Sequence, residues 1–422
     1  MIFCTYWFIL FCAIYFPLYW LVKKPSWRLA LLLLFSAVFH THFAGPAGVI
    51  PIVILALITY GAALAAEKIR GPEFASATEL QKKQAGWICI AAMSTVAGAL
   101  ITYKYYKFIL LDWLGLVNQP LGEYFAASMY KVMPEAPPLA ISFFAFEFIH
   151  YLFEVRRGGR AIKAPQEFAT FAIFFPSLVA GPIKRYQEFL PSLQKGLAHT
   201  GTKEVSTGLL VMSMGFFKKL ILADNINQFI IHKETFFNVM DLWERWLFLL
   251  ALAGRIYYDF SGYTDIALGL AMMMGIALPQ NFNRPYGAGS IQEFWQRWHM
   301  SLSFWIRDYI YIPLGGSKHG IPRRIFNGLF AFALCGMWHG ASWNFIFWGL
   351  YHGLGLTINT LYRKIPALGF VGKFFDKVPL AARAVTFLFV CFGWLSFFYP
   401  LDRAWQMALL LFGQTQLVEG AR

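Results

Sequence analysis

The chain has 422 residues, of which 58% are hydrophobic and 19% aromatic, while only 14% are charged. Such a composition holds too little polar surface to cover a water-soluble fold, so we predict an integral membrane protein. The formal net charge of +14 does not indicate a nucleic-acid partner, because the basic residues form short clusters between hydrophobic runs, as the positive-inside rule predicts.

Apolar runs follow one another along the chain. Several are shorter than the roughly 20 residues that a helix needs to cross a bilayer, and others are long enough for two passes. We therefore expect an all-α polytopic protein with about ten to twelve transmembrane or re-entrant helices, forming a single membrane domain over residues 1–422. The runs are Ile2–Val22, Trp27–Phe43, Val49–Ala66, Gly86–Tyr103, Pro138–Phe153, Phe168–Val179, Thr207–Ile231, Leu247–Ile276, Asn327–Asn359 and Ala384–Phe412.

Clusters of lysine and arginine alternate with connections that carry few of them. By the positive-inside rule, the clusters at residues 23–28, 68–83 and 156–163 are predicted to be cytoplasmic. The intervening connections, at residues 40–48 and 118–137, should face outward, which places the N-terminus outside.

An acidic pair interrupts the hydrophobic run at residues 247–276. Within a hydrophobic run, Asp259 and Asp265 need positively charged or hydrogen-bonding partners, and Arg255 is the nearest basic residue in the sequence. A buried network that fixes helix packing is the simplest interpretation of these carboxylates.

A second unusual segment runs from Phe294 to Gly316 and mixes aromatic residues with charged ones. It is too polar to span comfortably, so we predict an amphipathic or partly embedded helix that Pro313 and the glycines after it terminate. His299 and Ser303 are one helical turn apart and would share a face, which makes His299 a candidate pocket residue. The alternative is an ordinary interfacial histidine.

The peptide GMWHG at residues 336–340 places an imidazole inside a hydrophobic stretch at residues 327–359. Both flanks of this stretch are basic, so both ends should be cytoplasmic and the stretch must turn back. The twelve steps from residue 327 to His339 cover about 18 Å of helix, past the middle of a hydrocarbon core of roughly 30 Å. We predict a hairpin with a break at residues 340–344 that presents His339 to a water-accessible pocket, because ionisable groups at this depth are usually functional. The alternative is a packed histidine with a satisfied hydrogen bond.

Several common enzyme motifs are missing from the sequence. There is no HExxH, no CxxC and no complete P-loop, and residues 340–344 lack the second glycine of a nucleophile elbow. The five cysteines lie in apolar runs at spacings typical of neither a zinc site nor a disulfide framework. We therefore expect no bound metal or cofactor.

Five segments together resemble the membrane-bound O-acyltransferase family, particularly its bacterial branch for alginate O-acetylation and teichoic-acid D-alanylation. They occur in the family's order, and the most motif-dense part is residues 174–359. The segments are FFPSLVAGPIKRY from Phe174, YYDFSGYTDIALGLAMMMGI from Tyr257, QNFNRPY from Gln280, EFWQRWHMSLSFWIRDYIYIPLGG from Glu293 and GMWHGASWNFIFWG from Gly336.

The resemblance implies that His339 is the family's central catalytic histidine and His299 its second characteristic polar position, within helices around a central funnel or tunnel. Acyl transfer to a hydroxyl needs a base with a pKa near neutral, which histidine provides. Backbone amides near Gly340 are candidate oxyanion donors. The other candidate substrate-binding residues are Trp338, Trp343, Asn344, Ser303, Asp259 and Arg297.

The resemblance also implies a thioester co-substrate at the cytoplasmic face, either acetyl-CoA or an acyl carrier protein. The acceptor outside would be a cell-envelope polysaccharide or teichoic acid, or a transferase or relay protein serving it. Acetyl transfer is favoured by VAGPI, DFSGYTD, NFNRPY and IPLGG, while HMSLSFW and the compact length resemble the D-alanylating group. We expect a multi-pass protein of the bacterial inner membrane, whose basic loops dock an acidic carrier protein or anchor anionic lipid.

Two other classes of protein have some of these features. A transporter or flippase would also have broken helices and polar groups near the midplane, together with pseudo-symmetric halves; the sequence shows no such repeat. A scaffold that recruits a secreted transferase would explain the aromatic residues and basic loops, but it would not require a histidine at the deep turn.

Overall fold

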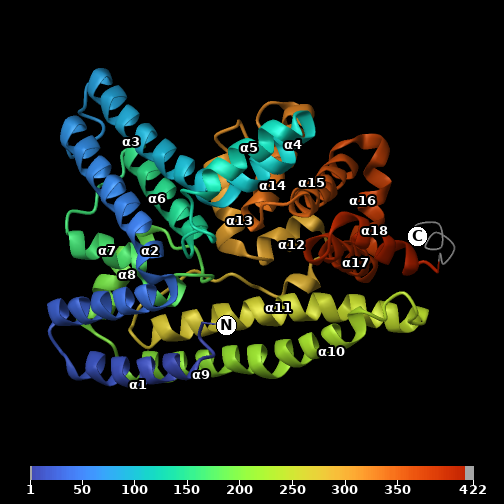
Figure 1. The fold of residues 1–422 in the computed structure, drawn as a ribbon, viewed down its shortest axis with the longest axis horizontal. Helices are drawn as coiled ribbons and strands as arrows, with labels where there is room; N and C mark the ends of the chain where they lie inside the picture. The colour runs from blue at the N-terminus through green and yellow to red at the C-terminus, as the bar shows by residue number, and fades with distance from the viewer. Residues whose placement is uncertain (1, 414–422) are drawn as a thin grey trace. The chain divides into compact units, whose positions relative to one another are not determined.

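The computed structural model describes residues 2–413, and within that range the ribbon holds helices and connections but no strand (Figure 1). The all-α prediction is confirmed. Within these residues, four helical segments are long and apolar enough to cross a membrane, and shorter apolar helices accompany them. The number of passes stays a prediction, because length and composition do not decide which shorter helices enter the bilayer. The four segments are Pro25–Arg70, Glu79–Tyr105, Thr202–Glu234 and Pro379–Phe398.

The chain divides into two compact units. The first comprises the chain up to Met212 together with Ile266–Pro279, and the second comprises Ser213–Asp265 together with the chain from Gln280. Every residue that the sequence singles out for the site, including His299 and His339, belongs to the second unit.

In its described residues, the first unit contains the α-helices α1 to α8, most of α9 and the end of α11. Gly45 interrupts α2 with a φ of 66°, a conformation that glycine adopts without strain, and it lies between two apolar runs that the sequence predicts there. The helices are α1 (Tyr6–Leu21), α2 (Pro25–Arg70), α3 (Glu79–Leu100), α4 (Leu114–Val117), α5 (Gln119–Tyr130), α6 (Ile141–Arg156), α7 (Pro165–Ile173), α8 (Tyr186–Ala198) and most of α9 (Thr202–Phe216).

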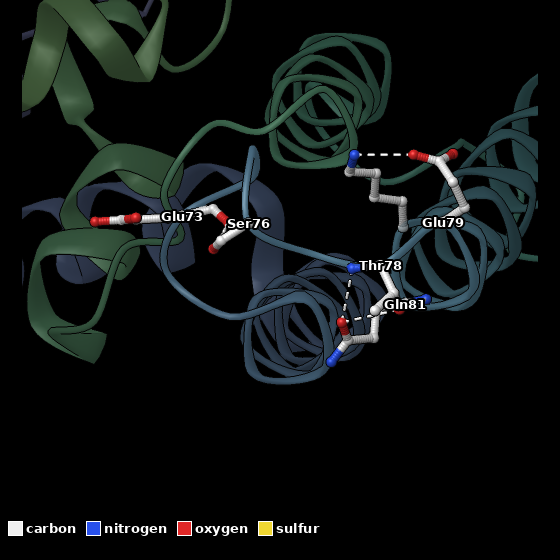
Figure 2. Close-up of polar contacts among 6 residues, drawn as sticks. Glu73, Ser76, Thr78, Glu79 and Gln81 are labelled. Carbon is white, nitrogen blue, oxygen red and sulfur yellow. Dashed lines mark hydrogen bonds and ion pairs between the residues drawn. The ribbon is translucent and has the colours of Figure 1, made fainter.

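The start of α3 is fixed by a capping box, which Figure 2 shows. The Thr78 side chain accepts a hydrogen bond from the Gln81 N–H at 3.2 Å, and the Gln81 side chain accepts one from the Thr78 N–H at 2.9 Å. Glu79 pairs with Lys82 at 2.9 Å in the same turn. Caps of this kind contribute about 1 kcal/mol and satisfy backbone N–H groups that a helix start leaves unpaired.

A buried ion pair holds the segment FFPSLVAGPIKRY against α6. Lys184 and Glu147 lie 2.6 Å apart, and their side chains are only 1% and 5% exposed. The Tyr186 N–H donates to His150 Nε2 at 3.2 Å on the same helix. Removing one partner of such a pair would leave an uncompensated buried charge, so the pair makes the placement of this segment specific.

The second unit carries the remaining helices. A π-helical turn, Phe217–Ala223, joins α9 to α10, and another, Arg307–Tyr311, follows α13. The helices are the end of α9, α10 (Asp224–Glu234), most of α11 (Leu242–Met272), α12 (Ile291–Arg297), α13 (Met300–Ile306), α14 (Gly320–His339), α15 (Trp343–Lys364), α16 (Gly369–Lys377), α17 (Pro379–Phe398) and α18 (Leu401–Leu410).

Candidate active site

The helices α14 and α15 form an antiparallel hairpin, orange in Figure 1. The helix α14 ends at His339 and α15 begins at Trp343, so the predicted break is confirmed. Gly336 and Gly349 let the two backbones touch, since a Cβ on Gly336 would overlap the carbonyl oxygen of Phe345. Close backbone approach through small residues is typical of helix pairs in membranes. The hairpin therefore holds the histidine at its tip by packing of the backbones themselves.

The His339 ring is half-buried among aromatic side chains. Its centroid lies 4.9 Å from that of Trp338, 5.1 Å from that of Trp348 on α15, and 5.1 Å from that of Phe397 on α17. Three elements thus surround the ring with apolar faces, which limits how the imidazole can turn.

The second histidine lies where the segment 294–316 breaks. The predicted amphipathic or partly embedded helix is divided in two here, because α12 ends at Arg297 and α13 starts at Met300. His299 between them has a φ of 42°, a left-handed conformation that is strained for a non-glycine residue. The expected end of the segment is confirmed, since Gly315 and Gly316 both have positive φ.

Asn281 holds the strained turn in place. Its carbonyl oxygen accepts from the Met300 N–H at 3.0 Å, and its Oδ1 accepts from the Ser301 N–H at 3.2 Å and from Ser301 Oγ at 2.6 Å. These bonds engage the first N–H groups of α13, which a helix start otherwise leaves unpaired. Asn281 lies in the QNFNRPY segment, and no local feature of the sequence predicts its role.

Trp338 contacts both histidines. Its ring centroid is 5.9 Å from that of His299 and 4.9 Å from that of His339. Burial, together with the nearby His339, lowers the pKa of His299 well below the ordinary histidine value. Both ring nitrogens of His299 are buried without a hydrogen-bond partner among residues 2–413. The hairpin tip thus brings together a neutral buried imidazole and a second, partly accessible one.

The other predicted residues at the tip differ in their contacts. Trp343 starts α15 and is 40% exposed. The Asn344 side chain donates to the carbonyl oxygen of Ser396 at 3.1 Å, which engages its N–H group with α17. Ser303 donates to the carbonyl oxygen of Trp298 at 3.1 Å, and its N–H bonds to the carbonyl oxygen of His299 at 2.9 Å. Whether the His299 and Ser303 side chains share a face stays a prediction, since the bond between these residues joins backbone atoms.

A cavity of about 260 Å³ lies beside the hairpin. Trp295, Ser303 and Cys335 line it, as do Arg324 and Arg307, of which Arg307 pairs with Asp308 at 2.7 Å. Cys335 stands one helical turn before His339 on α14. Among the described residues, no three His, Cys, Asp and Glu side chains lie close enough together to hold a metal ion.

The model of the membrane-bound O-acyltransferase family matches residues 163–401, more than half of the chain and all of the site described above. The chain belongs to this family. Curated relatives include the probable alginate O-acetylase AlgI of Azotobacter vinelandii, which is 38% identical over 283 residues, 65% of this chain and 54% of the relative. The peptidoglycan O-acetyltransferase of Helicobacter pylori is 32% identical over 74% of this chain and 61% of its own length. The teichoic acid D-alanyltransferase of Bacillus subtilis is 32% identical over 63% of this chain and 71% of its own length. The chain spans about half the length of the alginate O-acetylases that it matches.

In this membrane-bound O-acyltransferase family member, the carboxylates of α11 have partners other than the expected one. Asp259 pairs with Lys219 at 2.6 Å and Asp265 with Lys218 at 2.5 Å. Arg255 instead lies over the Phe398 ring, 4.9 Å from its centroid. The nearest basic residue in the sequence is not the partner, because Lys218 and Lys219 reach these carboxylates from the π-helical turn Phe217–Ala223. The sequence does contain a feature that indicates these partners, since two lysines inside the apolar run at residues 207–231 are unusual and need acidic partners themselves.

We expect Lys219→Met to destabilise the second unit. Lys219 also pairs with Asp224 at 2.6 Å, so its loss leaves two carboxylates unpaired. The cost should be about 1–2 kcal/mol, below the roughly 3–5 kcal/mol of a fully buried pair, because the two aspartate side chains are 44% and 48% exposed. The unfolding temperature of the purified protein measures this, with the exposed Lys203→Met as control. Equal unfolding temperatures for the two variants would contradict a stabilising role.

Arg297, another predicted substrate-binding residue, lies at the end of α12. Its guanidinium pairs with Glu293 on α12. It lines a second, polar cavity of about 350 Å³ together with Arg363 and Arg383.

Proposed function

We propose that this chain is an O-acyltransferase of the bacterial inner membrane that moves a small acyl group, preferably acetyl, from a cytoplasmic thioester to a hydroxyl outside. The acceptor is a cell-envelope glycopolymer or a relay protein that serves it. One observation carries the proposal: His299 and His339, the two histidines in the family's motifs, both contact Trp338 at the tip of one hairpin.

His339 is the general base in this proposal. It accepts the proton of the incoming hydroxyl as the oxygen forms a bond to the thioester carbonyl carbon. The tetrahedral intermediate collapses by breaking the C–S bond, and the imidazolium returns its proton to the leaving thiolate. General bases of this kind contribute roughly 10²- to 10⁴-fold, and histidine is suited to the role at neutral pH.

His299 has a positioning role. Because burial keeps it neutral, it offers one N–H donor and one acceptor nitrogen, with which it can orient the acceptor or the thioester. The backbone amides at the break after His339, together with Trp343, are the candidate donors to the oxyanion. A neutral imidazole also avoids placing a second positive charge beside the base.

The cavity of about 260 Å³ beside α14 suits the arm of the donor thioester. Its walls are largely apolar, and Arg324 would attract the phosphate of a phosphopantetheine group, whereas Arg307 is already paired with Asp308 at 2.7 Å. The loop before α14 is basic, which supports a cytoplasmic position for this entrance by the positive-inside rule.

We expect Arg324→Glu to raise the KM for the donor about tenfold, the change that corresponds to loss of one charge-assisted contact. The value of kcat should change little, because the reacting atoms lie near His339. Arg323→Glu is the matched control, since Arg323 is exposed and does not line the cavity. Initial rates over a range of donor concentrations measure both constants. Equal effects of the two variants would contradict this assignment.

The identities favour acetyl over D-alanyl transfer. The relatives named as alginate O-acetylases are 38–40% identical, and those named as teichoic acid D-alanyltransferases are 30–32% identical. D-alanyl transfer from a carrier-protein thioester to a teichoic acid is the second candidate, supported by the coverage of the Bacillus subtilis relative.

Two radiolabelled donors test the function directly. Membranes containing the wild type or His339→Ala are supplied with acetyl-CoA or with a D-alanyl carrier protein, together with candidate acceptors and partner proteins. His339-dependent transfer from one donor supports the acyltransferase and selects its acyl group. Correctly inserted protein that uses neither donor would contradict the proposal and favour another donor, transport or scaffolding.

A further inference from the structure

Two neighbouring cavities lie between α12, α15, α16 and α17. The first, of about 280 Å³, is mainly apolar and is lined by side chains such as Ile358, Val385 and Phe389. The second is the polar cavity of about 350 Å³ that Arg297 lines. Both are bounded by Phe375 and Ala382, so the apolar slot adjoins the polar cavity directly. Together they have the size of small-molecule sites, roughly 300–1,000 Å³.

The polar cavity carries an excess of positive charge. Glu293 is already engaged, because it accepts from the Gly289 N–H at 2.6 Å and pairs with Arg297. Arg363 makes only a loose pair with Asp376, at 3.7 Å. Arg383 has no acidic partner among residues 2–413. The cavity therefore presents a guanidinium that no carboxylate neutralises, which is the group best suited to bind phosphate.

The slot opens onto an apolar surface. Ile358 and Val385, which line it, are 50% and 54% exposed. The adjacent short helix α16 exposes Phe370 and Phe374 and carries Lys373, a combination typical of helices that lie at the membrane interface. The slot thus adjoins surface suited to hydrocarbon, while the arginine cavity adjoins surface suited to the head-group region.

We propose that these two cavities form one binding site for an anionic phospholipid, with its phosphate against Arg383 and Arg363 and an acyl chain in the slot. Arg297 also lines the polar cavity, but its charge is balanced by Glu293, so Arg383 and Arg363 provide the unbalanced positive charge. The ligand must carry both parts, because the polar cavity alone would accept any phosphate and the slot alone any apolar chain. This site is separate from the cavity proposed for the donor and does not depend on the proposed transfer reaction.

Binding is measured on the full chain, purified in detergent and freed of lipid, by native mass spectrometry during titration with phosphatidylglycerol. One molecule is expected to bind the wild type. Arg383→Glu and Ala382→Phe, which fills the junction of the two cavities, should each raise the dissociation constant about tenfold or more. Lys377→Glu and Ala381→Phe are matched controls that repeat the charge change and the added volume outside the cavity linings. They should bind as the wild type does.

Other probes distinguish the sources of the phosphate. Glycerol 3-phosphate, a head group without chains, and acetyl-CoA, a soluble phosphate carrier, should neither bind in an Arg383-dependent way nor displace the phospholipid. Displacement by acetyl-CoA would overturn the proposal in favour of a soluble ligand. Equal weakening by Lys377→Glu and Arg383→Glu would overturn it in favour of diffuse surface attraction. Arg383→Lys, which keeps the charge, should retain most of the binding and so tests the site even if Ala382→Phe fails to fold.

Discussion

Alanine in place of His339 is expected to reduce acyl transfer by a factor of roughly 10²–10⁴ or more, the contribution typical of a general base. The amount of protein in the membrane and its unfolding temperature should change little. The histidine is the last residue of α14 and is only half-buried, and the hairpin is held together by contacts through Gly336 and Gly349 rather than by the imidazole. Loss of activity should therefore be separable from loss of folding.

A single-turnover assay, with the labelled acyl group on the donor, gives the rate of the chemical step for wild type and variant. His339→Gln should be as inactive as His339→Ala, since glutamine can donate and accept hydrogen bonds but is not a base at neutral pH. The exposed His232 offers a matched control, because His232→Ala removes an imidazole from the same unit on α10. Near-normal transfer by well-expressed His339→Ala would exclude the general-base role.

The hairpin could be predicted because several independent features of the sequence agree. Basic residues on both flanks require the stretch to turn back, and GASWN at residues 340–344 supplies a break in the middle. The structure ends α14 and begins α15 on either side of Gly340–Ser342. His339 was identifiable for the same reason, as the titratable group next to that break.

The strained turn at His299 could not be predicted from local patterns. The periodicity of residues 294–316 is compatible with a helix, and the left-handed φ of His299 is held by hydrogen bonds to Asn281, eighteen positions earlier. Such tertiary support overrides local preference. The lysine partners of Asp259 and Asp265 could not be predicted from local patterns either. Lys219 and Lys218 reach these carboxylates from another helix.

Arg297 shows how proximity in sequence can mislead about a site. It stands two residues before His299, yet it pairs with Glu293 and lines a cavity bounded by α16 and α17. Arg297 ends α12, whereas His299 lies in the break before α13. His299 therefore lies among aromatic rings at the candidate active site, whereas Arg297 lies among charged side chains at the polar cavity.

Gly336→Ala is expected to destabilise the second unit strongly and to abolish transfer. The added Cβ would overlap the carbonyl oxygen of Phe345, a backbone atom that cannot move without shifting α15. Overpacking usually costs about 1–3 kcal/mol, and a clash with backbone lies at the upper end of that range or above it. Any shift at Gly336 also displaces His339, which is less than one helical turn further along α14.

The matched control is Gly98→Ala on α3, where the added Cβ would meet nothing within 4 Å. Alanine is the better helix former by about 0.8–1 kcal/mol, so this variant should be at least as stable as the wild type. Unfolding temperature and transfer rate are compared for both variants. Opposite signs in the two stability changes would show that contact between the helix backbones, rather than helix propensity, requires glycine at position 336. If Gly336→Ala were as stable and active as Gly98→Ala, α14 and α15 would have to be further apart than the hairpin described here, and the position of His339 would have to be reconsidered with them.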